Sequence, residues 1–165
     1  MSKGHVLILG AKSDIAMAIA HRFAKAGHPI QLAARGAQSL ETAQTDIAVR
    51  YDVAVDTYDF DALTVDSHAE FAADLDPMPQ IVVCAIGYMG EQAENESNVD
   101  EAVSVMRSNY EGPANILGIF ANHFEERGSG VLVGISSVAG SRGRAMNYVY
   151  GSAKAGFTAF LSGLR

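Results

Sequence analysis

Short apolar runs alternate with longer stretches in which apolar residues recur once per helical turn. The short runs have the length and composition of buried strands, and we predict five of them: His5–Leu9, Pro29–Ala34, Val53–Tyr58, Ile81–Ala85 and Val131–Ile135. Helices are predicted between and after these strands, over Asp14–Ala26, Gln38–Arg50, Ala62–Leu75, Val99–Arg127 and from Tyr148 to the end. Strands and helices therefore alternate along the whole chain.

Residues typical of turns separate these elements. Proline and glycine interrupt the pattern at Asp76–Pro79 and again at Gly128–Gly130. The polar stretch Gly90–Asn98 has no apolar period, and we predict a loop there. The long helix that follows is expected to break near Ser108 or Pro113.

The alternation predicts the fold class. Strands that alternate with helices form right-handed β-α-β units, which place a parallel sheet between two layers of helices. We find no internal repeat, linker or low-complexity segment, so residues 1–165 are expected to form a single α/β domain.

Composition and charge exclude several classes of protein. Hydrophobic residues make up 48% and charged residues 19%, which is ordinary for a globular protein. The net charge of −7 argues against a nucleic-acid binder, which needs a basic surface. The lone cysteine, Cys84, excludes an internal disulfide and a cysteine-rich zinc site, and the histidines lack metal-ligand spacing, so no metal is expected. No run approaches a membrane span or a signal peptide, and we expect a cytoplasmic protein.

The first strand-to-helix turn, Leu9–Ala16, suits a phosphate. The free N–H groups and the dipole at a helix start favour negative charge. Gly10 allows a tight bend, and Ser13 can cap the helix or bind a phosphate oxygen. Because only Gly10 of the three glycines of a dinucleotide fingerprint is present, a plain capped turn remains an alternative.

Tyr150 and Lys154 lie one helical turn apart, and Ser137 lies thirteen residues before the tyrosine. A phenol has an ordinary pKa of about 10, and a neighbouring ammonium favours the phenolate. A serine hydroxyl can hydrogen-bond the same substrate oxygen. These groups are suited to giving a proton to a carbonyl oxygen or taking one from an alcohol, although the spacing alone is common on surface helices.

Further segments match family motifs in chain order. Leu9–Ala16 takes the place of T-G-x-x-x-G-x-G, Cys84–Gly87 of N-N-A-G, and Ile135–Gly140 of I-S-S-x-A-G. With Asn109 in N-x-x-G and Tyr150 and Lys154 in Y-x-x-x-K, the chain resembles the short-chain dehydrogenase/reductase family over essentially all its residues. The resemblance implies a Rossmann-type doubly wound parallel sheet with strand order 3-2-1-4-5, without the family's last two strands.

The resemblance implies an oxidoreductase that transfers a hydride between a nicotinamide and a carbonyl or alcohol. Tyr150 would be the acid-base group, and Lys154 would lower its pKa and bind the nicotinamide ribose. Ser137 would orient the substrate carbonyl, and Asn109 would hold a water of the proton relay. The family pattern places the cofactor against Gly10, Lys12, Ser13, Asp14, Ile15, Arg35, Asp59, Phe60, Ala85, Ile86, Gly87, Tyr150 and Lys154, with Asp59 contacting the adenine.

NADP(H) is favoured over NAD(H) as the cofactor. An acid at the end of the second strand binds the ribose 2′-hydroxyl of NAD, but this strand ends in Ala33, Ala34 and Arg35. Arg35 can face a 2′-phosphate and Lys12 can assist it, unless both are ordinary surface cations.

The chain departs from the family at the first turn and near its end. Asp14 and Ala16 replace glycines, and we expect the Asp14 carboxylate to point away from the phosphates, at the helix start. Cys84 and Ile86 replace polar or small residues, so this segment is expected to contact the cofactor through its backbone. Family members usually continue past the position of Arg165 into two further strands and a substrate lobe.

A finer resemblance is to bacterial decaprenylphosphoryl-2-keto-ribose reductases. It is carried by stretches such as Asp59–Leu63 and Arg144–Ser152, and it implies a keto-sugar on a lipid phosphate, which Arg142 and Arg144 could meet. The alternative is that both arginines are solvent-exposed loop residues.

Two further expectations concern partners and activity. Apolar stripes on the last two helices usually belong to the core, but the family also uses these helices for dimers, so a homo-oligomer (dimer or tetramer) is expected. The stripes are Leu117, Phe120 and Phe124, then Phe157, Phe160 and Leu164. The alternative function is a non-catalytic dinucleotide-binding regulatory or scaffold protein, against which the intact Asn109, Ser137, Tyr150 and Lys154 count.

Overall fold

A computed structural model describes residues 3–165 and contains one five-stranded parallel sheet. The strands are β1 (Val6–Leu9), β2 (Ile30–Ala34), β3 (Val55–Asp59), β4 (Ile81–Cys84) and β5 (Val131–Gly134). Their order is β3-β2-β1-β4-β5, which confirms the predicted doubly wound sheet and its order. The order reverses between β1 and β4, where a ligand crevice is expected at the carboxyl ends of the strands.

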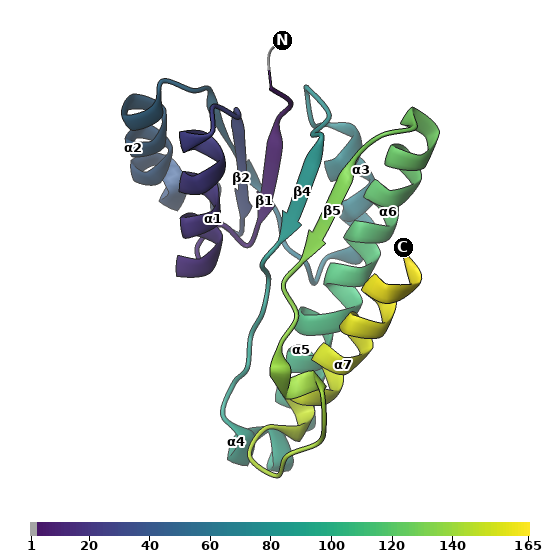
Figure 1. The fold of residues 1–165 in the computed structure, drawn as a ribbon. Helices are drawn as coiled ribbons and strands as arrows, with labels where there is room; N and C mark the ends of the chain where they lie inside the picture. The colour runs from purple at the N-terminus through teal and green to yellow at the C-terminus, as the bar shows by residue number, and fades with distance from the viewer. Residues whose placement is uncertain (1–2) are drawn as a thin grey trace.

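Helices cover both faces of this sheet (Figure 1). Helix α1 (Asp14–Lys25) and α2 (Glu41–Tyr51) cover one face, and α3 (His68–Ala73), α6 (Gly112–Arg127) and α7 (Tyr148–Gly163) cover the other. Two shorter helices, α4 (Gln92–Ser97) and α5 (Val99–Met106), lie beyond the carboxyl ends of the strands. No helix among the described residues is both long enough and apolar enough to cross a bilayer.

The two hydrophobic layers explain why the strands read as continuous apolar runs. In β1 the side chains alternate between layers, Val6 and Ile8 facing α1 and Leu7 and Leu9 facing α6. All four are fully buried because each face is covered. The predicted apolar stripes on the last two helices contribute to the second layer through Leu117, Phe120, Phe124 and Phe157. These four residues are therefore core.

Three predicted elements differ from the structure. The segment Gly90–Asn98, predicted as a loop, contains α4, a polar helix with no apolar stripe to reveal it. The Asn98 side chain then caps α5 by accepting hydrogen bonds from the amides of Asp100 and Glu101. The helix predicted over Ala62–Leu75 is shorter, because its first part is a loop and a 3₁₀ turn before α3.

The break predicted near Ser108 or Pro113 is instead a π-helical turn, Arg107–Glu111, that joins α5 to α6. Proline lacks the N–H that an α-helix needs in its interior, and a wider turn before Pro113 accommodates that loss. Directly after the turn, Gly112 packs on the loop that follows β3. A Cβ added at Gly112 would overlap the Ala62 carbonyl oxygen and stand 2.9 Å from its carbon. Glycine therefore permits this close contact.

Candidate cofactor cleft and catalytic residues

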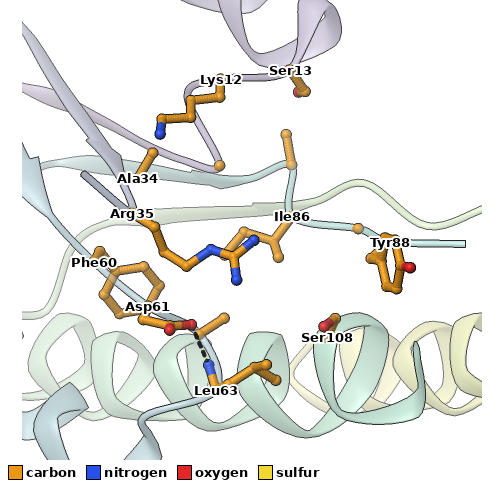
Figure 2. Close-up of a pocket in the computed structure, with 14 residues that line it drawn as sticks. Lys12, Ser13, Ala34, Arg35, Phe60, Asp61, Leu63, Ile86, Tyr88 and Ser108 are labelled. Carbon is orange, nitrogen blue, oxygen red and sulfur yellow. Dashed lines mark hydrogen bonds between the residues drawn. The ribbon is translucent and has the colours of Figure 1, made fainter. Parts of the chain in front are cut away.

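A cleft of about 330 Å³ opens at the carboxyl ends of β1, β2 and β4 (Figure 2). Its lining residues come from the loops that follow these strands and β3, and from the π-helical turn: Gly10, Lys12, Ser13, Ala34, Arg35, Phe60, Asp61, Ala62, Leu63, Ala85, Ile86, Gly87, Tyr88 and Ser108. In Figure 2, Lys12, Arg35 and Phe60 lie toward one end of the cleft, and Tyr88 and Ser108 lie toward the other. One end of the cleft therefore carries positive charge and the other carries hydroxyl groups, an arrangement that suits a long ligand.

The turn after β1 has the geometry of a phosphate site. Gly10 has a φ of 84°, and a Cβ there would stand 3.0 Å from the Ile86 side chain and 3.1 Å from the Ala85 carbonyl oxygen. The Ser13 hydroxyl oxygen accepts a hydrogen bond from the Ala16 amide at 3.1 Å and retains its own proton to donate. The start of α1 therefore presents N–H groups and a hydroxyl to an anion.

Two cations stand at one end of the cleft. Arg35 directly follows β2, and Lys12 lies in the turn after β1. The Lys12 ammonium is 3.6 Å from the point where a Cβ on Gly36 would stand, so it lies beside the loop that carries Arg35. Neither forms an ion pair with any residue in the described part of the chain. Both charges are available to a ligand phosphate.

The structure places Asp61, and not Asp59, in the lining of the cleft. The Asp59 carboxylate accepts a hydrogen bond from the Gly36 amide at 2.9 Å and so holds the turn after β2. The Asp61 carboxylate accepts one from the Leu63 amide at 2.9 Å, within the cleft wall. The adenine contact predicted for Asp59 stays a prediction, and Asp61 is a candidate that motif matching missed.

Two side chains from outside the cleft hold this wall in place. His68 is fully buried; its Nε2 lies 3.3 Å from the Asp61 carbonyl oxygen and its Nδ1 lies 2.9 Å from the Asn115 side chain. The Arg107 guanidinium donates to the Leu63 carbonyl at 3.1 Å. The loop after β3 is thereby fixed to α6 and the π-helical turn.

Lys154 lies beside Gly87, which lines the cleft, and next to Tyr150, although neither Lys154 nor Tyr150 is part of the cleft lining. Its ammonium donates to the carbonyls of Ile86 (3.3 Å) and Ile135 (3.1 Å), and it lies 5.9 Å from the centre of the Tyr150 ring. The side chain is 3% exposed, and this burial lowers its pKa from the ordinary value. The carbonyl contacts place a cation between the chain segments that follow β4 and β5.

Asn109 is fully buried in the π-helical turn and fixes the segment after β4. Its side-chain oxygen accepts from the Tyr88 amide at 3.3 Å, and its NH₂ group donates to the carbonyls of Tyr88 and Val105. A Cβ on Gly87 would stand 3.1 Å from this oxygen and 3.5 Å from the Lys154 ammonium. Asn109 and Lys154 therefore meet beside Gly87, at the wall of the cleft.

The loop that carries Ser137 packs tightly on α7, the helix that contains Tyr150 and Lys154. Its hydroxyl oxygen accepts from the Ala139 amide at 3.1 Å and caps the 3₁₀ turn Val138–Gly140. A Cβ on Gly151 would stand 2.7 Å from the Ala139 carbonyl oxygen, so glycine allows this turn to touch the helix next to Tyr150.

The structure thus brings most of the predicted site residues together. Eight of the predicted cofactor contacts line the cleft: Gly10, Lys12, Ser13, Arg35, Phe60, Ala85, Ile86 and Gly87. Asp59, Tyr150 and Lys154 are not part of the lining. Asp14 and Ile15 are exposed at the start of α1 and lie outside the cleft lining. Residues that the sequence did not single out also line it, namely Ala34, Asp61, Ala62, Leu63, Tyr88 and Ser108. Ala34, Asp61, Tyr88 and Ser108 each adjoin a predicted residue, and Asp61, Ala62 and Leu63 belong to the stretch Asp59–Leu63 that carries the finer resemblance.

Comparison with known proteins defines the class. Residues 4–165 match the family model of the short-chain dehydrogenases, and the chain belongs to this family. It is 39% identical over 163 residues to an uncharacterized oxidoreductase of Mycobacterium tuberculosis, covering 96% of this chain and 65% of the relative. It is 38% identical over 166 residues to an uncharacterized oxidoreductase of Streptomyces coelicolor, covering 96% of this chain and 64% of the relative. The chain therefore spans just under two thirds of the length of these relatives.

Solved structures share the same fold. An alcohol dehydrogenase of Comamonas testosteroni specific for bulky-bulky ketones superposes with a TM-score of 0.90 at 23% identity, over 99% of this chain and 67% of that one. A variant of actinorhodin polyketide ketoreductase, solved with NADPH, superposes with a TM-score of 0.88 at 25% identity, over 99% and 66%. The ketoreductase was solved with NADPH, and in the present structure the turn at Gly10 and the start of α1 present the N–H groups that the phosphates of such a dinucleotide require.

Proposed function

We propose that this chain is the nucleotide-binding and catalytic part of a reductase that transfers a hydride from a nicotinamide to a carbonyl substrate. The observation that carries the proposal is the buried Lys154 ammonium, which lies next to Tyr150 and beside Gly87 in the wall of a cleft whose other wall is the glycine turn after β1. Burial destabilises the charged form of a lysine side chain. A protein that only binds a dinucleotide would bear this cost without benefit, because it has no use for a buried cation beside a phenol.

In the proposed reaction the cofactor supplies the hydride, and the protein handles the proton. Tyr150 donates its phenolic proton to the substrate oxygen. The Lys154 ammonium stabilises the phenolate that remains, since opposite charges a few ångströms apart attract strongly in a desolvated cleft. Ser137 orients the same oxygen, and Asn109 holds the segment after β4 against the cofactor.

NADP(H) is the proposed cofactor. Arg35 and Lys12 supply positive charge at the end of the cleft where the resemblance places the adenosine ribose, and no carboxylate directly follows β2. A related Arabidopsis thaliana protein, 27% identical over 151 residues, is named an NADPH-dependent pterin aldehyde reductase. In a fluorescence titration, NADPH should bind at least about tenfold tighter than NADH, and Arg35→Ala should remove most of that difference. Equal affinities in the original chain would overturn the assignment.

Tyr150→Phe tests the function itself. The variant should bind NADPH as before but lose at least about a hundredfold in turnover of ketones or aldehydes, because the acid is gone. Tyr148→Phe, two residues earlier on the same helix and 47% exposed, is the matched control and should retain activity. If the original chain binds NADPH yet reduces no carbonyl compound, or if Tyr150→Phe is as active as Tyr148→Phe, the catalytic proposal fails and a regulatory binder is favoured.

The proposed substrate is a keto-sugar carried on a lipid phosphate, as the finer resemblance implies. Arg142 and Arg144 support it, since both are exposed in the loop before α7 and neither is in an ion pair within the described residues. Arg144→Ala should raise KM for a phosphorylated keto-sugar and leave an unphosphorylated ketone unaffected. An unchanged KM for the phosphorylated substrate would exclude this role of Arg144.

A homo-oligomer is also proposed, and an exposed stripe on α5 supports it in addition to the predicted stripe on α7, whose Leu164 is 40% exposed. Val99, Val103, Met106 and Tyr110 recur at helical spacing from α5 into the π-helical turn and are 40–77% exposed. An exposed apolar stripe of this kind is typical of an interaction surface. Sedimentation of the chain should show a dimer or tetramer that Val103→Lys weakens.

A further inference from the structure

The cleft carries a second tyrosine that the proposed chemistry does not use. Tyr88 lies in the segment after β4, lines the cleft and is 46% exposed. Its hydroxyl donates to the Glu101 carboxylate of α5 at 2.5 Å. In Figure 2 it lies at the end of the cleft opposite Lys12 and Arg35.

The position of Tyr88 is fixed from both sides. Asn109 binds both its amide and its carbonyl, and Glu101 holds the phenol. The preceding residue, Gly87, lies beside the Lys154 ammonium. Tyr88 is therefore a rigid neighbour of the proposed catalytic groups, placed where it can contact a substrate carbonyl compound.

The side chains of Tyr88 and Glu101 can accept hydrogen bonds from a ligand, but they have no free proton with which to donate one. The single phenolic proton already points to Glu101, and an ionised carboxylate has only lone pairs. The hydrogen bond to Glu101, then its negative charge and those of Glu94 and Glu91, raise the pKa of Tyr88, so the phenol stays protonated. A ligand group that meets this pair must bring its own proton.

A buried acceptor without a partner lies beside the same carboxylate. Asn95 is 5% exposed, and its NH₂ group donates to the Met89 carbonyl at 3.2 Å. Its side-chain oxygen has no hydrogen-bond partner among the described residues. This oxygen and Glu101 Oε1 each lie 3.1 Å from the point where a Cβ on Gly90 would stand. A buried acceptor is costly until a donor pairs with it.

The charges nearby favour a neutral donor. Glu91, Glu94 and Glu101 repel an anionic group at this end of the cleft, whereas the Lys154 ammonium beside Gly87 repels a cation. A hydroxyl group carries a proton to donate and no charge, so it can pair with the free lone pairs of Tyr88 and Glu101 without either penalty, whereas the buried Asn95 oxygen is out of its reach.

We propose that Tyr88 and Glu101 recognise a hydroxyl group close to the substrate's carbonyl, so that the protein prefers hydroxyketones to ketones that lack the hydroxyl. The inference rests on the proposed carbonyl reduction for the identity of the ligand. It assigns a specificity role to Glu101, which no motif of the sequence singles out.

The test compares two ketones that differ by one hydroxyl, 2-hydroxycyclohexanone and cyclohexanone. Their binding to the NADP⁺-loaded chain is measured by calorimetry, and their reduction is measured with NADPH. The original chain should bind the hydroxyketone at least about tenfold tighter, because hydrogen bonds to charged groups are strong. Glu101→Gln, which replaces a pure acceptor with an amide, should lower this preference to within about threefold of parity without changing the affinity for cyclohexanone. Asp100→Asn, an exposed neighbour on the same helix, is the matched control and should keep the full preference.

The outcomes separate this inference from the proposed function. If the original chain shows no preference for the hydroxyketone, or if Glu101→Gln preserves the preference, the specificity role is wrong even when both ketones are reduced. If the preference depends on Glu101 but NADPH is never oxidised, the recognition site stands and the catalytic proposal fails. Tyr88→Phe should weaken the preference in the same direction as Glu101→Gln.

Discussion

Gly112→Ala should destabilise the protein, although alanine is the better helix former. The added methyl group would overlap the Ala62 carbonyl oxygen and stand 2.9 Å from its carbon, closer than the 3.0 Å that real Cβ atoms respect. Both partners are backbone atoms, so α6 or the loop after β3 must move. Forcing extra volume into a packed contact costs about 1–3 kcal/mol.

Gly118→Ala is the matched control. Gly118 lies in the same helix, but a Cβ there would have only the Phe160 ring nearby, at 4.0 Å. Both substitutions gain similar helix propensity, so the difference between them isolates the overlap. Gly112→Ala should be less stable than Gly118→Ala by about 1–3 kcal/mol in urea unfolding, which is about 2–12 °C in Tm.

The same pair of variants tests the link to the cleft. Ala62 lines the cleft, so Gly112→Ala should also weaken NADPH binding in a fluorescence titration, and Gly118→Ala should not. Equal unfolding free energies for the two variants would show that the contact between Gly112 and the loop is not tight, and the reasoning would be refuted.

Two further predictions concern buried titratable groups. Burial raises the pKa of the Cys84 thiol to about 11, so only about one thiol in a thousand is ionised at pH 8. Iodoacetamide should therefore label Cys84 only after urea unfolding, as measured by mass spectrometry. Labelling of the native chain as fast as that of the unfolded chain would contradict this prediction. Burial lowers the pKa of Lys154, so between that lowered value and its ordinary pKa of 10.5 the unfolded chain binds more protons than the native one. The unfolding free energy of the original chain, relative to Lys154→Met, should therefore rise with pH through that window, and a flat or falling difference in urea titrations would contradict the burial argument.

The parts of the fold that depend on local pattern could be predicted from the sequence. Val6–Leu9 is apolar throughout because it is buried on both faces, and an unbroken apolar run of strand length predicts such burial. Helix α4 could not be predicted, because Ala93 is its only apolar residue and no apolar stripe marks one face. The start of α3 could not be predicted either, since the loop from Asp61 has no glycine or proline to announce it.

The candidate site was predictable only as far as its motifs reach. Gly10, Arg35 and Ala85 follow strands directly, so strand prediction already places them at one edge of the sheet. Asp59 and Asp61 have the same chemistry two positions apart, and only the end of β3 at Asp59 decides which of them faces the cleft. The contact between Tyr88 and Glu101 depends on how two loops and a helix pack, and no spacing in the sequence encodes it.

The π-helical turn at Arg107–Glu111 changes the rotational phase of the helix that contains it. In an uninterrupted α-helix, residues seven apart, such as Tyr110 and Leu117, would point within about 20° of each other. Tyr110 is nevertheless 44% exposed, whereas Leu117 is fully buried. One extra residue in the wide turn rotates α6 relative to α5 by up to about 100°. The continuous helix therefore has one apolar stripe that faces outward, from α5 into the turn, and a second that faces the core in α6. Removing one residue from this turn would bring the two stripes into line and make the outward surface and the core compete for the same face.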